Sequence, residues 1–192
     1  MKIGVLALQG AFIEHEKMLR SLGVETVQVR LPVHLDGLDG LIIPGGESTT
    51  IGKLATDYGL MQPLRDFATY KPTWGTCAGM IFLAKDLGQH HQPILGLMDV
   101  TVNRNAFGRQ IDSFEADLDI AVLGETPYHA VFIRAPVITQ AAPQVEVLAK
   151  FSDDQIVAAR EGHLLATAFH PELTNDTRFH TYFLGMIKSS ES

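Results

Sequence analysis

The first half of the chain contains three short strand-like runs that each stop at a turn with glycine, and no other feature constrains the fold as much. Residues 2–8 and 41–43 are apolar runs that stop at Gln9-Gly10 and Pro44-Gly45-Gly46, and residues 73–74 are a short strand that stops at Gly75. A nearly continuous apolar run is typical of a strand that is buried on both faces. Such strands belong to parallel sheets, whose two faces are covered by helices.

Helical patterns lie between these runs. Phe12, Met18, Leu19 and Leu22 share one helical face, and Gly23 is placed to end that helix. Another strand is expected at residues 25–29, a helical pattern resumes at about residue 50, and residues 78–84 form a further helix. Strands that alternate with helices predict a three-layer α/β/α fold with a doubly wound, mostly parallel sheet.

The second half has strand-like segments and few helical signals. These segments are residues 99–103, 113–120, 130–133, 145–151 and 155–160. We expect them to be antiparallel additions to the same sheet, because their spacing is too tight for a second core. An apolar strand at residues 164–169 and an amphipathic closing helix follow. A chain of 192 residues is therefore expected to form one domain, residues 1–192.

The composition argues against several classes of partner and compartment. The formal net charge is −7, so nucleic acid and anionic membranes are not expected as main partners. Cys77 is the single cysteine, which suits a reducing compartment. We see no signal-peptide pattern and no apolar stretch near the roughly 20 residues of a membrane span. We therefore expect a soluble, cytoplasmic protein.

Gly75-Thr76-Cys77-Ala78-Gly79 lies between a predicted strand and a predicted helix, and it has the form of a nucleophile elbow with Cys in place of Ser. The turn is so sharp that the residues two before and two after the nucleophile must lack bulk. The following helix points its positive end at the sulfur, which favours a nucleophilic thiolate. The Ala78 N–H can also stabilise a developing oxyanion. The alternative is a buried structural cysteine, the commonest fate of a lone cysteine.

A thiolate nucleophile needs a proton shuttle, and His170-Pro171-Glu172 follows the apolar strand at residues 164–169. In an extended chain residues i and i+2 point the same way, so Glu172 can orient one nitrogen of His170 while the other faces Cys77. Taken alone, these three residues fit a surface turn better. Paired with the elbow, His170 is the expected base, and we expect no comparable setting for the other seven histidines.

Pro44-Gly45-Gly46-Glu47-Ser48 follows an expected strand, where glycines let backbone N–H groups approach a ligand. In α/β enzymes with an elbow, such a loop supplies the second oxyanion donor. The alternative is a phosphate-binding nest. Residues 46–53 resemble a P-loop, but the spacing to Gly52-Lys53 is one residue too long, and Leu54 stands where Ser or Thr should bind magnesium. We therefore do not expect nucleotide binding.

Two arginines are candidates for binding a substrate, and the order of the site residues along the chain argues against one class of enzyme. Arg104 and Arg134 end or follow strands, and either could hold a substrate carboxylate, although a solvated surface role is commoner for an arginine. Cys77 precedes His170 and Glu172, whereas α/β-hydrolases place the acid before the histidine. The α/β-hydrolase class therefore fits poorly.

With an elbow cysteine and a later His-x-Glu, the sequence resembles the class I glutamine amidotransferases, the triad glutaminases, over essentially its whole length. Within that superfamily, further segments are similar to the glutaminase subunits of pyridoxal phosphate synthases. These segments are residues 8–11, 44–50, 104–110, 113–117, 132–136 and 169–173, with Ile81 where many triad glutaminases carry Gln.

The resemblance implies a catalytic triad of Cys77, His170 and Glu172 that hydrolyses L-glutamine. It also implies a glutamine pocket and an oxyanion hole. The pocket residues would be Gly46, Glu47, Ser48, Arg104, Ile133 and Arg134, and the oxyanion donors the N–H groups of Gly46 and Ala78. The partner would be the synthase subunit of a ring-shaped complex, whose docking sets the oxyanion loop. No organic cofactor or metal is implied on this chain.

Two other functions remain open at this point. The first is another elbow-cysteine enzyme, such as a thiol esterase or a peptidase-like relative. The second is a non-catalytic binding or regulatory module on the same fold.

Overall fold

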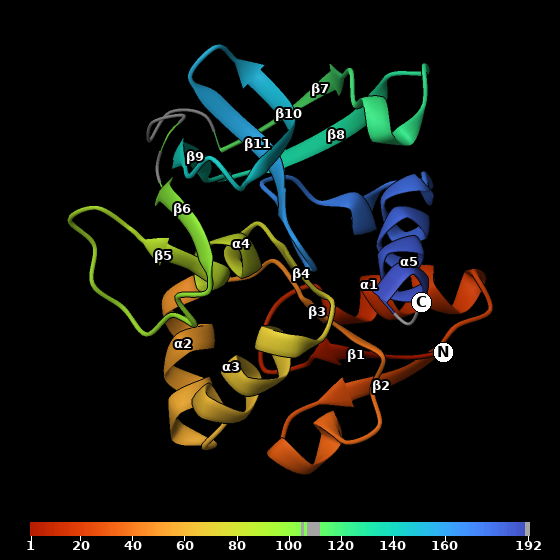
Figure 1. Cartoon of the computed structure of the whole chain (residues 1–192), viewed down its shortest axis with the longest axis vertical. Helices are drawn as coiled ribbons and strands as arrows, with labels where there is room; N and C mark the ends of the chain where they lie inside the picture. Colours follow the sequence, from red (N-terminus) through yellow and green to blue (C-terminus); the bar gives the residue numbers. More distant parts are fainter. Residues whose placement is uncertain (105, 107–111, 191–192) are drawn as a thin grey trace.

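Strands from both halves of the chain join in one large sheet, with helices on its two faces (Figure 1). The computed structural model describes residues 1–104, 106 and 112–190. Its strands are β1 (Lys2–Leu6), β2 (Glu25–Val29), β3 (Gly40–Ile43), β4 (Thr73–Thr76), β5 (Ala84–Asp86), β6 (Met98–Asn103), β7 (Ser113–Leu118), β8 (Tyr128–Ile133), β9 (Val137–Ala141), β10 (Glu146–Ser152), β11 (Gln155–Glu161) and β12 (Leu164–Thr167). Its helices are α1 (Phe12–Ser21), α2 (Ser48–Asp57), α3 (Met61–Tyr70), α4 (Ala78–Leu83) and α5 (Arg178–Ser190), with 3₁₀ turns η1 (Pro32–Leu35), η2 (Ala121–Leu123) and η3 (Pro171–Leu173).

The parallel part of the sheet brings the site-bearing loops together. The strands β2, β1, β3, β4 and β12 pair in parallel in that order. The register sets Ile43 of β3 beside Gly75 of β4, and Gly75 beside Ala166 of β12. Because the three strands run the same way, the segments that follow them leave the same edge of the sheet side by side. These neighbouring segments carry the glycine loop, Cys77 and His170.

The helices divide between the two faces of the sheet (Figure 1). On one face, α1 and α5 meet around Trp74, which packs against Phe179, His180 and Phe183 of α5 and against His15 of α1. On the other face, α4 packs on β3, β4 and β12, and α2 packs on both α4 and α3. The fold is therefore a doubly wound α/β/α arrangement, as the alternation of strands and helices predicted.

In the β-rich half, two of the expected strands lie in a different sheet from the one expected. The strands β6, β9, β10 and β11 do join the main sheet through antiparallel pairs. The expected strands at 113–120 and 130–133 instead form a separate two-stranded sheet of β7 and β8. This ribbon lies on the core through one face only, where Phe132 packs against Phe169. The expectation that all these strands extend one sheet was therefore wrong for β7 and β8.

A continuous set of buried apolar side chains extends from Ile3 in β1 to Ile187 in α5. It includes the parallel strands, the facing sides of the helices and the inner face of β8. The same cluster holds Tyr128, Ala130 and Phe132 of the separate ribbon. The β7–β8 ribbon thus shares the core of the large sheet.

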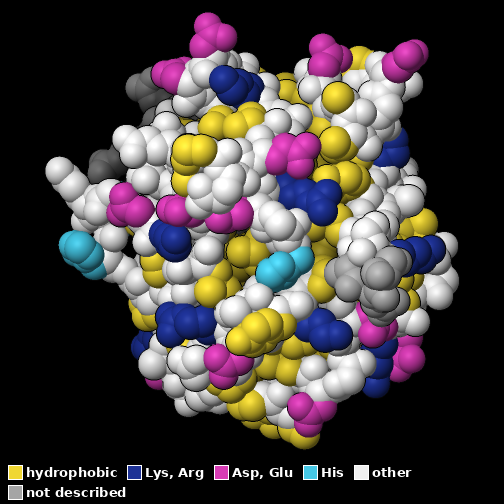
Figure 2. Space-filling model, viewed as in Figure 1, with side chains coloured by type: hydrophobic (Ala, Val, Ile, Leu, Met, Phe, Trp, Pro, Cys, Tyr) yellow, Lys and Arg dark blue, Asp and Glu magenta, His cyan; other side chains and the backbone are white. Residues whose placement is uncertain are grey.

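The surface carries charges of both signs. On the face shown in Figure 2, acidic and basic side chains alternate with apolar ones, and the described residues visible there form no extended basic field. Such a field is what a phosphate backbone requires. Within the part of the chain that the structure describes, no helix is long and apolar enough to cross a membrane.

Candidate active site

Cys77 occupies a strained turn between β4 and α4. Its backbone has φ 48° and ψ −104°, a conformation that L-residues rarely adopt. The Cys77 N–H donates to the Thr167 carbonyl oxygen of β12 at 2.8 Å, which ties the turn to the neighbouring strand. Strain of this kind persists only where the surroundings hold it, and it clusters at functional sites. This geometry is that of the nucleophile elbow predicted from the sequence.

The two glycines of the elbow have no room for a side chain. A Cβ atom on Gly75 would meet the backbone of Gly79 and Met80, and one on Gly79 would meet the Ile43 carbonyl oxygen. Because backbone atoms cannot move aside as a flexible side chain can, both positions require glycine. The start of α4 can therefore lie directly against β3 and β4.

His170 and Glu172 lie beside the elbow. The Nδ1 atom of His170 is 2.7 Å from Oε1 of Glu172, and the His170 N–H donates to the Val131 carbonyl oxygen of β8 at 2.9 Å. The contact forms in a different local geometry from the one expected. β12 ends at Thr167, and Glu172 lies in the 3₁₀ turn η3, so the extended link through Pro171 was wrong. Proline at the first position of the turn fixes φ and favours this tight geometry.

The electrostatics of this pair keep both groups charged. Burial alone lowers the pKa of His170, but hydrogen bonds with Cys77 and Glu172 outweigh burial and raise that pKa to about 10. Burial alone raises the pKa of Glu172, but nearby His15 and the hydrogen bond from His170 hold it below its usual value. An imidazolium between a sulfur and a carboxylate is the state that a thiolate nucleophile requires.

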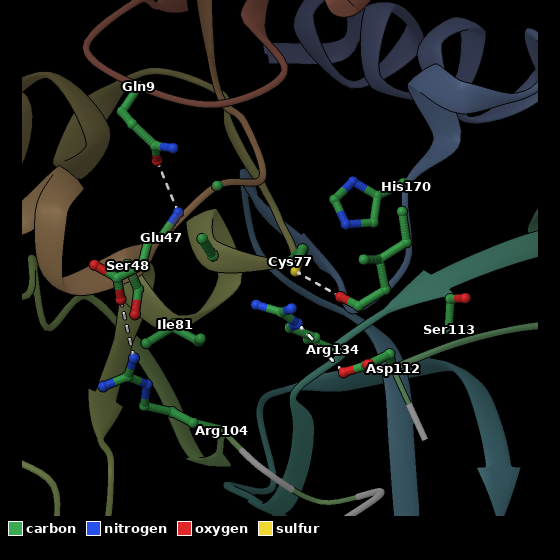
Figure 3. A pocket seen from close by; sticks show the side chains of 13 residues that line it. Gln9, Glu47, Ser48, Cys77, Ile81, Arg104, Asp112, Ser113, Arg134 and His170 are labelled. Carbon is green, nitrogen blue, oxygen red and sulfur yellow. Dashed lines mark hydrogen bonds and ion pairs between the residues drawn. The ribbon is translucent and has the colours of Figure 1, made fainter. Parts of the chain in front are cut away.

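A cavity of about 680 Å³ opens above the sulfur of Cys77 (Figure 3). In this view Cys77 lies between His170 on one side and the group of Glu47, Ser48 and Arg104 on the other. The lining residues are Gln9, Gly46, Glu47, Ser48, Cys77, Ala78, Ile81, Arg104, Asp112, Ser113, Ile133, Arg134 and His170. Every predicted pocket residue therefore contributes to one cavity, together with the predicted nucleophile and base.

Glu47 connects the glycine loop to the pocket wall. As the N-cap of α2, its carboxylate accepts hydrogen bonds from the backbone N–H groups of Thr49 and Thr50, and it forms an ion pair with Arg104 at 3.3 Å. Burial works against the charge, but these Thr50 and Thr49 hydrogen bonds lower the pKa of Glu47. The wall of the cavity thus carries a carboxylate and a guanidinium side by side.

Ile133 and Arg134 approach the nucleophile through the backbone. The Cys77 Sγ is 3.8 Å from the Ile133 carbonyl oxygen, within reach of a weak S–H···O hydrogen bond. Arg134 follows with a positive φ of 45°, and its exposed side chain is paired with Asp112 at 3.5 Å. The strained residue turns the chain at the end of β8 so that the Ile133 carbonyl faces the sulfur.

The peptide between Gly45 and Gly46 has a defined orientation. The Gly45 carbonyl oxygen accepts from the Ala11 N–H at 3.0 Å, and Gly10, at φ 97°, leaves the space for this approach. A trans peptide directs its N–H away from its carbonyl. Among the described residues, no acceptor is found for the Gly46 N–H or the Ala78 N–H. Gly46 and Ala78 are both among the residues that line the cavity.

Sequence reasoning did not assign Gln9, Ile81, Asp112 or Ser113 to the cavity, and it did not place His15 beside the site. Gln9 lines the cavity, and its side-chain oxygen accepts from the Glu47 N–H at 2.7 Å. His15 is fully buried against Glu172, so the expectation that no other histidine has a comparable setting was wrong. Of the motif at residues 104–110, only Arg104 and Ala106 lie within the described residues, so the remaining positions lie outside them.

The fold and the site together define a class, that of the α/β glutamine amidotransferases. A crystal structure of a glutamine amidotransferase is 51% identical to this chain with a TM-score of 0.91, covering 97% of this chain and 98% of the other. A glutamine amidotransferase from Thermotoga maritima, 12% identical with a TM-score of 0.62, shares the fold over the whole chain and 85% of its own length. Residues 5–189 match the model of the SNO glutamine amidotransferase family, and the chain belongs to that family.

Curated relatives are similar over their full length. The pyridoxal 5'-phosphate synthase subunit PdxT of Herpetosiphon aurantiacus is 62% identical over 190 residues, which cover 97% of this chain and 100% of the relative. The protein of the same name from Moorella thermoacetica is 60% identical over 188 residues, with the same coverage. The family resemblance expected from the sequence segments is therefore confirmed.

Proposed function

We propose that this chain is a glutaminase that hydrolyses L-glutamine to L-glutamate and ammonia, and that it delivers the ammonia to the synthase subunit of a pyridoxal phosphate synthase. One observation carries the proposal: a cysteine in a strained elbow interacts with a histidine that is itself hydrogen-bonded to a buried glutamate, at the floor of a charged cavity. The whole chain, residues 1–192, acts as one cytoplasmic glutaminase domain, without an organic cofactor or metal of its own.

The chemistry uses Cys77, His170 and Glu172 in separate roles. The Cys77 thiolate attacks the side-chain amide carbon of glutamine, and His170 gives its proton to the departing ammonia. Water then attacks the thioester carbon while His170 accepts a proton from that water, and the C–S bond breaks to release glutamate and restore the Cys77 thiolate and the His170 imidazolium. Glu172 fixes the tautomer of His170 and stabilises the imidazolium. The raised pKa of His170 supports its role as the proton donor.

The remaining pocket residues bind the substrate and the developing charge. The Glu47–Arg104 pair supports recognition of the α-amino and α-carboxylate groups of glutamine, with Ser48, Ile133 and Arg134 completing the pocket. The N–H groups of Gly46 and Ala78 stabilise the oxyanion of the tetrahedral intermediate. The Gly45 carbonyl, held by Ala11 N–H, supports this role because it leaves the Gly46 N–H directed away from α1.

The names of the relatives support the choice of partner. Both of the relatives described above are subunits of pyridoxal 5'-phosphate synthase. Ammonia free in neutral water is mostly protonated and poorly nucleophilic, so an enclosed transfer to a synthase subunit preserves its reactivity. We expect the two subunits to form a hetero-oligomeric ring complex in which docking completes the oxyanion hole.

The test is glutamate release by the purified chain mixed with its synthase subunit. We expect release from L-glutamine with the wild type and none with Cys77→Ala, while pyridoxal phosphate synthesis by the Cys77→Ala complex continues when ammonia is supplied directly. Turnover of simple esters without glutamate release would indicate a thiol esterase. Unchanged synthesis from glutamine alone by the Cys77→Ala complex would indicate a non-catalytic module.

A further inference from the structure

The proposed triad accounts for only one of the two carboxylate oxygens of Glu172. Oε1 is bound by His170 Nδ1 at 2.7 Å, but Oε2 has no hydrogen bond of ordinary geometry among the described residues. The Glu172 side chain is completely buried. A buried charged oxygen without a donor is costly, and native structures rarely leave one unexplained.

The group nearest to that oxygen comes from α1. His15 Nε2 lies 3.4 Å from Glu172 Oε2, and both side chains are inaccessible to solvent. The same nitrogen is 3.2 Å from the Thr76 hydroxyl, which belongs to the residue before the nucleophile. The other ring nitrogen of His15 is 3.0 Å from Nε2 of His180 in α5. Contacts between buried side chains thus connect α5, through His15 of α1, to the carboxylate of Glu172.

The carboxylate of Glu172 determines the tautomers of His15 and His180. An ionised carboxylate only accepts hydrogen bonds, so His15 presents an N–H at Nε2, shared between Glu172 and Thr76. His15 Nδ1 then accepts the N–H of His180 Nε2, and His180 Nδ1 keeps a lone pair. The reverse assignment would set a lone pair against the carboxylate and leave His180 Nδ1–H as a buried donor without an acceptor. We therefore assign the first arrangement from these contacts.

The surroundings keep both of these histidines neutral. Burial lowers the pKa of His15, although Glu172 opposes that effect, and burial together with His15 lowers the pKa of His180 to about 2. Trp74 packs edge-on against both rings and fixes their orientation. A neutral His15 has a single N–H. Because His180 donates a hydrogen bond to Nδ1 of His15, that N–H is placed on Nε2.

We propose that His15 is a positioning residue for the active site: its Nε2–H, oriented by His180, holds the second oxygen of Glu172 while the first oxygen stays aligned on His170. This inference rests on the proposed function, since it assumes that Glu172 serves His170 in glutamine hydrolysis. The contact of 3.4 Å is longer than an ordinary hydrogen bond, but an N–H dipole directed at a buried charge still stabilises it.

The positioning role has a consequence for pH dependence. The ionisable groups around Glu172 are His15 from α1, His180 behind it from α5, His170 from the same turn and Tyr128 from β8. Loss of the His15 N–H removes stabilisation of the charged carboxylate, and the pKa of Glu172 rises. Activity on the acidic side should then be lost at higher pH, which loss of packing alone would not cause.

The experiment compares His15→Leu, His15→Gln and Phe183→Leu in the full chain with its synthase subunit. His15→Leu removes the donor at similar volume, whereas the amide of His15→Gln can present an N–H in place of Nε2. Phe183→Leu is the matched control, because it loosens the same packing around Trp74 without touching Glu172. Glutamate release is measured against glutamine concentration and pH, and thermal unfolding reports the stability of each variant.

We expect His15→Leu to lower kcat by about 10-fold to 100-fold and to shift the acidic limb of the pH profile upward. The KM for glutamine should stay within about twofold, since His15 does not line the cavity. His15→Gln should recover kcat to within about threefold and restore the acidic limb, and Phe183→Leu should keep the wild-type limb.

Three outcomes would overturn the inference: a wild-type kcat in His15→Leu, no recovery in folded His15→Gln, or the same kcat loss and limb shift in Phe183→Leu. If His15→Leu does not fold, kcat is measured for His180→Leu instead. This variant keeps the His15 ring and removes only the donor to His15 Nδ1. An unchanged kcat in folded His180→Leu would then reject the inference. A wild-type complex that releases no glutamate would instead contradict the proposed function.

Discussion

The imidazole of His170 and the carboxylate of Glu172 are joined by a hydrogen bond of 2.7 Å, with His170 as the N-cap of the 3₁₀ turn η3 and Glu172 within that turn. Glu172→Gln keeps the shape of the side chain and removes its charge. We expect the variant to fold and kcat for glutamate release to fall by roughly 100-fold or more, because the imidazolium loses its anion. Equal rates for variant and wild type, measured with the synthase subunit present, would contradict the triad assignment.

The raised pKa of His170 predicts an alkaline limit to turnover. Its pKa in the folded chain is about 10, above the ordinary value of 6.5. His170 therefore remains protonated at neutral pH, and the proton needed by departing ammonia is lost as pH rises through about 10. In Glu172→Gln, the carboxylate that helps to raise this pKa is absent, so the alkaline limb should move to lower pH. A limb at the same pH in both proteins would show that Glu172 does not control the proton on His170.

The same pKa shift has a signature in stability. A group whose pKa is higher in the folded than in the unfolded chain contributes stability that is complete below its unfolded value and is lost as pH rises through its folded value. For His170 this window runs from about 6.5 to about 10. Urea unfolding across that window should show a smaller decline for Glu172→Gln than for the wild type.

The elbow glycines give a test of the fold at the nucleophile. Gly79→Ala would drive a methyl group into the Ile43 carbonyl of β3, so we expect a loss of about 2–4 kcal/mol in unfolding free energy and little glutaminase activity. Gly185→Ala in α5 is the matched control. A Cβ atom there meets nothing within 4 Å, so alanine should stabilise the helix by about 0.5–1 kcal/mol. Thermal or urea unfolding of the two variants measures both effects. A Gly79→Ala protein as stable as the wild type would show that α4 does not need its close approach to β3.

Much of this site could be predicted because its residues follow parallel strands. The glycine loop, Cys77 and His170 each come after a strand-like run, and parallel strands bring such positions to one edge of the sheet. The pattern of apolar residues and the turn residues that follow it were enough to locate these three positions. The geometry between His170 and Glu172 was not predictable in the same way, because an extended segment and a 3₁₀ turn both bring residues i and i+2 close together.

His15 shows where pattern reasoning stopped. It lies three residues after Phe12 and four before Leu19, on the apolar face of α1, and His180 lies three residues before Phe183 on α5. A histidine at such a position is a signal of burial that the sequence did carry. Its partner could not be read from the sequence, because the contact depends on how α1 and α5 pack around Trp74.

The wrong prediction that β7 and β8 extend the main sheet has a different cause. Alternation of buried and exposed residues identifies a strand but not the sheet that it joins. Tyr128, Ala130 and Phe132 point into the core, whereas Glu115 and Asp117 of the partner strand lie at the surface with His129. Nothing in a period of two distinguishes this ribbon from an added edge strand. The short strand β9 was missed because only Val137 and Ile138 carry an apolar signal.

Glu47 has two roles that a pair of variants can separate. It caps α2, and it pairs with Arg104 in the cavity. Glu47→Ala loses both, so we expect about 1 kcal/mol lower stability together with a higher KM for glutamine. Glu47→Asn keeps a side chain that caps helices well but lacks the charge, so stability should return while KM stays high. If KM and stability recover together in Glu47→Asn, the charge of Glu47 plays no part in binding glutamine.

A second buried acid, Glu16, holds α1 to β2 and gives a test that is independent of catalysis. Its carboxylate accepts from Gln28 at 2.8 Å and from Arg20 at 3.1 Å, while Thr26 lies at 3.4 Å. Glu16→Ala removes the acceptor and leaves the part-buried donors of Thr26 and Gln28 without this partner, so the free energy of unfolding should fall by about 1–3 kcal/mol. Lys17→Ala, on the exposed side of the same helix, should change stability by less than about 0.5 kcal/mol. Because α1 also carries His15, a large loss of kcat in a Glu16→Ala protein that remains folded would indicate that the position of α1 affects the carboxylate of Glu172. Unfolding curves that are identical for the two variants would show that the Glu16 network does not hold α1 in place.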